Sequence, residues 1–386
     1  MIAERAYLDW NATAPLRPQA RAALLTALDL VGNPSSVHGE GRTARRVVER
    51  ARAQVAGLAG ADPAQVTFTS GGTEANMLAL SPGWAEARRV PVSALLVSAI
   101  EHPSVQQGGR FASEHVRPIA VTPQGILDLG ALRAALRAEP ALVSVMLANN
   151  ETGVVQPIAE AADIVHEEGG LLHVDAVQGP GRIACDIKAL KADFLTLSAH
   201  KLGGPKGVGA LVRRDGLHLA DPLIRGGGQE RGLRAGTENV AGIAAFGAAA
   251  EAAGQALGSE VAHMARLRDY LEAGLKAATP DVIIFGEDVE RLPNTTLFTH
   301  PGLRAETAVI AFDLDGVAVS SGAACSSGKV QPSHVLAAMG VEPALARGAV
   351  RASLGHNTTE AEIDRCLNAW IKLSQSLLKG RAIIAA

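Results

Sequence analysis

Short apolar runs alternate with longer segments of helical periodicity over the first two thirds of the chain. Seven of these runs predict strands, at 65–70, 94–99, 117–121, 142–148, 171–176, 193–199 and 208–214. They are mostly uniformly apolar, which is typical of strands covered on both faces of a sheet. Helices are predicted at 73–89, 128–139 and 157–168. The pattern predicts an α/β fold in which helices sandwich a mostly parallel seven-stranded sheet.

The pattern changes near residue 258. A long helical segment and a second one at the end of the chain enclose four strand-like runs. The helices are predicted at 260–278 and 359–378, and the strands at 282–286, 294–299, 308–314 and 348–354. We expect a large domain over 15–257, and a smaller α+β domain formed by 1–14 together with 258–386.

Composition and charge narrow the class of protein. The 386 residues are 47% hydrophobic and 19% charged, as in a folded globular protein. A formal net charge of −3 without a Lys/Arg run gives no basis for binding nucleic acid or a membrane surface. We expect no membrane-spanning segment and no signal peptide. Cys185, Cys325 and Cys366 lie far apart without a CxxC spacing, so we expect neither disulfides nor a resident metal site, and a cytoplasmic location.

Polar residues follow several of the predicted strands. In open α/β sheets, ligands bind beyond the carboxyl ends of the strands. Gly71, Gly72 and Thr73 form a glycine turn at a helix start, where free backbone amides suit a phosphate. The other polar residues at strand ends are His102, Asn150, Asp175, Gln178, Ser198, His200 and Lys201.

This set of side chains matches what pyridoxal phosphate requires. Lys201 would form the Schiff base and Asp175 would pair with the pyridinium nitrogen, so that the ring can accept electrons. His102 would stack on the ring and Gln178 would bond its hydroxyl group. As isolated residues, each also has an ordinary interpretation as a cap, turn or loop residue. A nucleotide site is disfavoured because neither GxxxxGK[ST] nor GxGxxG occurs in "LGGPKGVG".

Two residues of the predicted small domain are further candidates. Cys325 lies in "SSGAACSSG" among small residues, and we expect an exposed loop there. It is either a reactive nucleophile or an incidental thiol, whereas Cys185 and Cys366 have structural surroundings. Arg351 is either a binder of a substrate carboxylate or a solvated charge at a strand edge.

Over nearly its whole length the chain resembles the cysteine desulfurases, fold-type I pyridoxal-phosphate enzymes of the class V aminotransferase group. It is most similar to the bacterial type that serves nitrogenase or general iron–sulfur assembly. The motifs that carry the resemblance include "HVDAVQ", "SAHKLGGPKGVGAL", "GGGQERGLRAGTENV" and "SSGAACSSG".

The resemblance implies a role for each candidate residue. Lys201 is the Schiff-base lysine, Cys325 the nucleophile that carries a persulfide, and His102 a catalytic residue stacked over the ring. The implied phosphate-binding residues are Gly72, Thr73, Ser198, His200 and, reaching the neighbouring subunit, Thr237. The implied ring-binding residues are Asn150, Asp175 and Gln178. The implied substrate-binding residues are Asn11, Asn150 and Arg351.

The implied reaction converts L-cysteine to L-alanine and transfers sulfur to Cys325. The implied partners are a second copy of the chain, in a homodimer, and a sulfur-acceptor or iron–sulfur scaffold protein, with Cys325 as a possible transient ligand of a shared cluster. The alternatives are a selenocysteine lyase, a class V aminotransferase, or a protein that retains the pocket without catalysis. The sequence leaves open which acceptor receives the sulfur.

Overall fold

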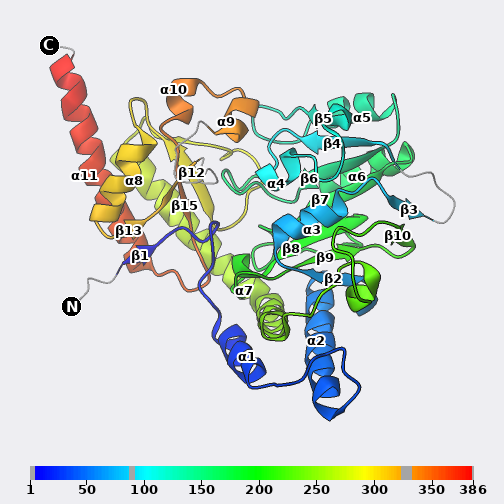
Figure 1. The fold of residues 1–386 in the computed structure, drawn as a ribbon. Helices are drawn as coiled ribbons and strands as arrows, with labels where there is room; N and C mark the ends of the chain where they lie inside the picture. Colours follow the sequence, from blue (N-terminus) through cyan, green and yellow to red (C-terminus); the bar gives the residue numbers. More distant parts are fainter. Residues whose placement is uncertain (1–4, 87–91, 323–332, 385–386) are drawn as a thin grey trace.

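A seven-stranded sheet forms the centre of the larger part of the protein (Figure 1). The structure is a computed structural model that describes residues 5–86, 92–322 and 333–384. The strand order is β2-β9-β8-β7-β6-β4-β5; β9 runs antiparallel to both of its neighbours, and the other pairs are parallel. The strands are β2 (Val66–Thr69), β4 (Ala94–Ser98), β5 (Val116–Ile119), β6 (Ala141–Met146), β7 (Leu171–Asp175), β8 (Phe194–Ser198) and β9 (Gly209–Arg213). The mostly parallel seven-stranded sheet is therefore confirmed.

Helices cover both faces of this sheet. On one face, α2 (Gly39–Leu58), α5 (Leu129–Leu136), α6 (Ile158–Glu167) and the first half of α7 (Val240–Ala278) share a core with the strands. On the other face, α3 (Gly72–Ala79) and α4 (Pro103–Gln106) pack on alternate strand residues such as Leu95 and Val97. Because both faces are covered, β4, β6, β7 and β8 are buried along their whole length.

The helix predicted at 73–89 is wrong beyond Ala79 as far as Glu86, and residues 87–89 lie outside the described residues. Helix α3 ends at Ala79, shortly before Pro82 and Gly83, which both disfavour a continuing helix. Beyond them, β3 (Trp84–Glu86) pairs antiparallel with β10 (Leu217–Leu219).

A smaller four-stranded sheet organises the other part of the protein. Its order is β11 (Ile283–Ile284), β12 (Thr295–Thr299), β15 (Val350–Ser353) and β14 (Ser320–Ser321), with antiparallel neighbours. The N-terminal strand β1 (Ala6–Tyr7) pairs with β13 (Val317–Ala318). The core here is built around the aromatic rings of Phe298, Phe312 and Trp370.

The strand predicted at 308–314 is wrong, because α8 (Ala305–Leu314) occupies these residues. Ile310 and Leu314 are exposed on this helix while Phe312 is buried, so the apolar run is not a buried strand. The remaining elements complete the chain. They are α1 (Pro18–Leu28), α9 (His334–Ala338), α10 (Pro343–Ala346), α11 (Glu360–Ile384), and the 3₁₀ turns η1 (Pro63–Gln65), η2 (Ser113–His115), η3 (Ala199–Lys201) and η4 (Gln229–Gly232).

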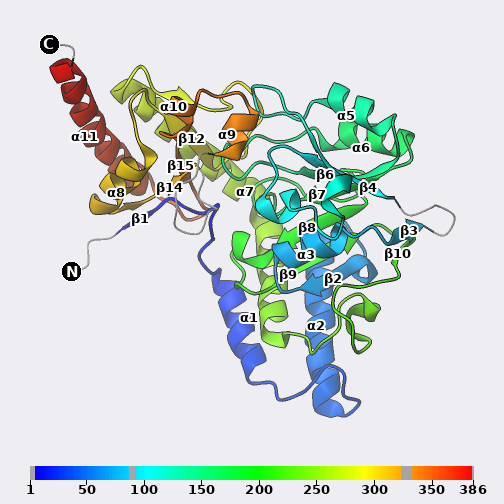
Figure 2. The same ribbon diagram turned by 45° about the horizontal axis from the view of Figure 1, so that its top comes forward.

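Helix α7 runs between the two sheets, and its packing explains its composition (Figures 1 and 2). Among the described helices, it alone is long and apolar enough to cross a membrane, with a mean hydropathy of 1.3 in its most apolar stretch. Half of that stretch is buried inside the protein, and α7 packs along α1 and α2 as an interior helix. The domain boundary expected at 257/258 falls within α7 and stays a prediction.

Candidate active site

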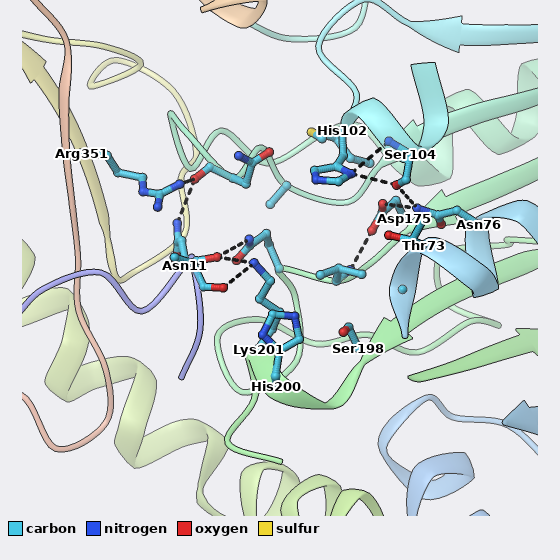
Figure 3. Close-up of a pocket in the computed structure, with 17 residues that line it drawn as sticks. Asn11, Thr73, Asn76, His102, Ser104, Asp175, Ser198, His200, Lys201 and Arg351 are labelled. Carbon is cyan, nitrogen blue, oxygen red and sulfur yellow. Dashed lines mark hydrogen bonds between the residues drawn. The ribbon is translucent and has the colours of Figure 1, made fainter. Parts of the chain in front are cut away.

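A cavity of about 300 Å³ opens at the carboxyl ends of β6, β7 and β8, where the large sheet faces the N-terminal segment and β15 (Figure 3). It brings together eleven of the residues predicted from the sequence. They are Asn11, Gly72, Thr73, His102, Asn150, Asp175, Gln178, Ser198, His200, Lys201 and Arg351. The strand-end side chains therefore converge, as expected for this type of sheet.

Lys201 is held by backbone carbonyl groups of the N-terminal segment. It lies in η3, directly after β8, and its Nζ donates to the oxygen of Asn11 at 2.5 Å and of Ala12 at 3.0 Å. The side-chain amide of Gln178 donates to the same oxygen of Asn11 at 3.1 Å. Two donors thus converge on one carbonyl group beside the cavity.

Asp175 ends β7 with its carboxylate at the cavity wall and only 6% of the residue exposed. Its Oδ2 accepts a 2.9 Å hydrogen bond from Asn76, and its Oδ1 accepts a 3.0 Å bond from the backbone of Val177. These bonds fix the carboxylate without neutralising it, so it can pair with a protonated nitrogen of a ligand.

His102 precedes α4 and points its ring into the cavity (Figure 3). Its Nδ1 accepts from the backbone N–H of Ser104 at 3.1 Å and lies 2.8 Å from the Ser104 hydroxyl, which in turn accepts from Asn76. Burial lowers the pKa of His102 and outweighs the opposite effect of the Asp175 carboxylate. Since Nδ1 accepts a hydrogen bond, the neutral ring carries its proton on Nε2.

The start of α3 forms a narrow cradle against β7 and β8. A Cβ at Gly72 would lie 3.0 Å from Cγ2 of Val177 and 3.4 Å from Cβ of Ser198, so a larger residue would crowd this wall. The first N–H groups of a helix have no intrahelical acceptor and favour an anion. Ser198 and His200 line the same cavity. Burial, aided by Lys201 and Lys206, lowers the pKa of His200 to about 4, so its ring is neutral.

Arg351 reaches the cavity from β15 of the smaller sheet. One guanidinium nitrogen donates to the oxygen of Asn150 at 2.9 Å and another to Oδ1 of Asp9 at 2.7 Å, while the buried Nε lacks a partner. By contrast, both the nitrogen and the oxygen of the Asn11 side-chain amide are hydrogen-bonded within the protein. Its amide donates to Asn150 and Thr295, and its oxygen accepts from Asn294.

Two predicted residues are not part of this cluster. Thr237 is exposed and does not line the cavity, and Cys325 lies outside the described residues. Two residues that were not predicted belong to the cluster: Asn76, one turn into α3, and Ser104, two residues after His102. Their spacing could have indicated both, because Asn76 lies one helical turn after Thr73 and Ser104 lies in the turn that follows His102. Among the residues that the structure describes, no cluster of His, Cys, Asp and Glu side chains could hold a metal ion.

The donor set fits pyridoxal phosphate. An anion cradle, a buried carboxylate and an amine line one cavity, and the buried Oδ1 of Asn76 and Nε of Arg351 have no protein partner. Gly72, Thr73, Ser198 and His200 would hold the phosphate, Asp175 the ring nitrogen, and Lys201 the reactive carbon. This fold and this cavity define a pyridoxal-phosphate enzyme of fold type I.

The chain belongs to the aminotransferase class-V family, whose profile matches residues 6–366. It is 46% identical over 372 residues to a cysteine desulfurase of Cereibacter sphaeroides, covering 94% of each chain. It is 42% identical over 370 residues to a cysteine desulfurase of Klebsiella pneumoniae, covering 94% of this chain and 90% of that protein. The dependence on pyridoxal phosphate is a property of this family.

Solved structures share the fold. A NifS-like protein from Rickettsia africae superposes with a TM-score of 0.88 at 38% identity, covering 96% of this chain and all of that chain. A structure described as SspA in complex with cysteine has a TM-score of 0.75 at 29% identity, covering 92% of this chain and all of that chain.

Proposed function

We propose that this protein is a cysteine desulfurase, which converts L-cysteine to L-alanine and transfers the sulfur atom to its own Cys325. The observation that carries the proposal is the single cavity lined by Lys201, Asp175 and Arg351, which supply an amine, a carboxylate and a guanidinium. Relatives that bear this name cover almost the full chain at 40–46% identity, which supports the same activity.

Arg351 would bind the substrate carboxylate. A guanidinium matches a carboxylate with two parallel hydrogen bonds, and Arg351 is 2% exposed, so water competes little. Its present partners, Asp9 and Asn150, keep it pointed at the cavity. A carboxylate bound there would leave the substrate amino group in the cavity that Lys201 also lines.

Lys201 and His102 would move protons. Pyridoxal phosphate, when bound, accepts the electron pair left at the substrate α-carbon. Lys201 lies where its amine can take the proton from that carbon, once it is no longer held by Asn11 and Ala12. His102 holds a proton on Nε2 toward the cavity and can exchange it with the substrate sulfur.

The sulfur transfer balances without an added oxidant. The Cys325 thiolate attacks the substrate sulfur, the bond between that sulfur and the β-carbon breaks, and the carbon receives the electron pair and then a proton. The products are L-alanine and a persulfide on Cys325, formed from one L-cysteine and one thiol.

The test compares cysteine variants for sulfide release from L-cysteine in the presence of a reductant. Cys325→Ala should keep the bound yellow cofactor and lose sulfide release, whereas Cys185→Ala and Cys366→Ala, which replace buried free thiols, serve as controls. Full activity of the Cys325 variant would overturn the persulfide role. Preference for selenocysteine, or amino transfer to a keto acid, would favour the two alternative activities.

The active form would be a homodimer. Thr237 is exposed in one chain and would complete the phosphate site of the second copy. Large apolar side chains also lie exposed on the N-terminal part and near Thr237 in sequence, namely Leu25, Leu28, Val31, Val37, Leu223 and Ile224. Burial of these side chains against a second copy would favour association. Light scattering should give twice the chain mass, and a monomer with full cofactor affinity would contradict this proposal.

The sulfur acceptor would be another protein, such as an iron–sulfur scaffold, and the compartment the cytoplasm. Cys185 and Cys366 are free and buried, as is typical of proteins in a reducing compartment. The test follows radiolabelled sulfur from Cys325 to a purified iron–sulfur scaffold protein, and labelling of the scaffold would support this acceptor. Transfer only to tRNA-modifying proteins would contradict it.

A further inference from the structure

Arg182 is a buried cation whose donors go to neutral oxygens. It follows β7 by seven residues and is 4% exposed. Its Nη1 donates to the backbone oxygen of Gln178 at 2.9 Å and also contacts the side-chain Oε1 of Gln178. Its Nη2 lies 3.4 Å from the backbone oxygens of Trp10 and Lys201. None of the ion pairs in the described part of the chain includes it.

Burying a cation without a carboxylate partner costs folding free energy, which points to a functional reason for Arg182. Burial lowers the pKa of Arg182 to about 9, with Arg351 adding to the effect, yet the group stays protonated at neutral pH. A buried charge without a carboxylate partner is rare and needs several hydrogen bonds to be tolerated. Arg182 has them: Gln178 and Lys201 line the cavity themselves, and Trp10 directly precedes the lining residues Asn11 and Ala12.

The contact with Gln178 fixes which end of its amide faces the cavity. An arginine side chain has donors only, so the atom of Gln178 that it touches must be the acceptor Oε1. The Nε2 group is therefore turned the other way, toward the oxygen of Asn11 at 3.1 Å. Lys201 donates to that same oxygen, so the amide donor lies beside the reactive amine.

We propose that Arg182 is a positioning residue that holds the Gln178 amide so that its N–H donates to the oxygen atom of the cofactor ring next to the carbon bound by Lys201. This inference rests on the proposed function only for the identity of the cofactor. The amide N–H that Arg182 holds in place favours the ionised form of that ring oxygen by donating a hydrogen bond to it. Loss of Arg182 should therefore change the protonation of the bound chromophore.

The experiment titrates the absorbance of the holoenzyme against pH for R182M and R182K, with cofactor affinity as a second readout. R182M fills the space but has no donor, so the chromophore pKa should rise by about one unit and the affinity should fall about tenfold. Lysine, like arginine, has only donors, so R182K should bind the cofactor within about threefold of the parent affinity. Its chromophore pKa should shift little. Equal behaviour of R182M and the parent, or of R182M and R182K, would overturn the proposal.

A double-mutant cycle separates positioning from a direct effect. In a Q178L background, R182M should cause no further shift, because the amide that it orients is gone. An undiminished shift there would also overturn the proposal. If R182M does not fold, R182Q replaces it, since a glutamine can accept as well as donate and leaves the Gln178 amide free to turn. A parent enzyme that binds the cofactor but releases no sulfide would refute the proposed function and not this inference.

Discussion

The side-chain amide of Asn76 donates a 2.9 Å hydrogen bond to the carboxylate of Asp175. The bond joins the first turns of α3 to the end of β7, and it orients the carboxylate that we assign to the cofactor nitrogen. The same amide nitrogen donates to the Ser104 hydroxyl at 2.9 Å, which links it to His102. Asn76, which was not predicted from the sequence, thus supports both Asp175 and His102, which were.

Replacing Asn76 should weaken cofactor binding. Asn76→Leu removes a donor to a charged acceptor, and we expect about a tenfold loss of affinity for pyridoxal phosphate. Asn76→Asp should lose more, because it places a second carboxylate against Asp175. Absorbance titration of the apoenzyme measures both values. Asn357→Asp, at an exposed position, adds the same charge elsewhere as a control, and parental affinity in the Asn76→Asp protein would contradict the assignment.

Glu151 should give the stability of the protein a distinct pH dependence. Burial raises the pKa of this carboxyl from 4.5 to about 7, although Ser333 donates to it at 2.5 Å and Arg351 lies near. The folded state therefore binds the proton more tightly than the unfolded state. The free energy of unfolding should fall as pH rises from about 4.5 to about 7, by roughly 3 kcal/mol from this group.

The measurement compares urea unfolding of the parent and of Glu151→Gln across this pH range. The variant lacks the titrating group, so its stability should fall less, while Glu101, whose pKa is also raised by burial, contributes equally to both proteins. Glu139→Gln, at an exposed ion pair, should follow the parent. Identical pH profiles for the parent and Glu151→Gln would refute this prediction.

Replacing one partner of the buried ion pair between Arg52 and Glu230 should destabilise the protein more than replacing both partners. The guanidinium donates to both carboxylate oxygens at 2.7 and 2.8 Å, and each side chain is 2% exposed. Glu230→Met leaves the buried Arg52 with only the longer carboxylate contact to Glu49 at 3.2 Å and should cost about 3–5 kcal/mol, whereas Arg52→Met with Glu230→Met should recover most of that loss. Denaturant unfolding measures both.

A surface pair provides the comparison for this prediction. Arg225 and Asp221 form an exposed ion pair near Glu230 in sequence, and Arg225→Met should change stability by less than about 1 kcal/mol. A loss of stability in the Arg52/Glu230 double variant as large as in Glu230→Met alone would show that the ion pair is not the cause.

The fold could be predicted where burial leaves a clear pattern. All seven strands of the large sheet follow apolar runs, because both faces of that sheet are covered. A short apolar run does not distinguish a strand from a helix. Residues 308–314 were therefore predicted as a strand although they form part of α8. The helix predicted at 73–89 is too long because Pro82 and Gly83, shortly after the end of α3 at Ala79, disfavour its continuation.

The site could be predicted where a side chain follows a strand directly. Asp175, Lys201 and His102 lie at strand ends, and the topology of the sheet brings them to one edge. Asn76 and Arg182 were not predicted from the sequence because they act through other residues, and only the folded structure shows their contacts. The structure gathers Asp175, Lys201 and His102 at one cavity, but the roles of all the predicted site residues, Cys325 and Thr237 included, stay predictions.

The central claim is a covalent link between pyridoxal phosphate and the amine of Lys201. Borohydride reduction of the holoenzyme followed by peptide mass spectrometry tests it directly, with Lys206→Ala, which removes a nearby exposed lysine, as the control. The account predicts one phosphopyridoxyl group on Lys201 in the parent and in Lys206→Ala, and none in Lys201→Ala. A protein that stays unlabelled after reconstitution, or is labelled at another lysine, would contradict it.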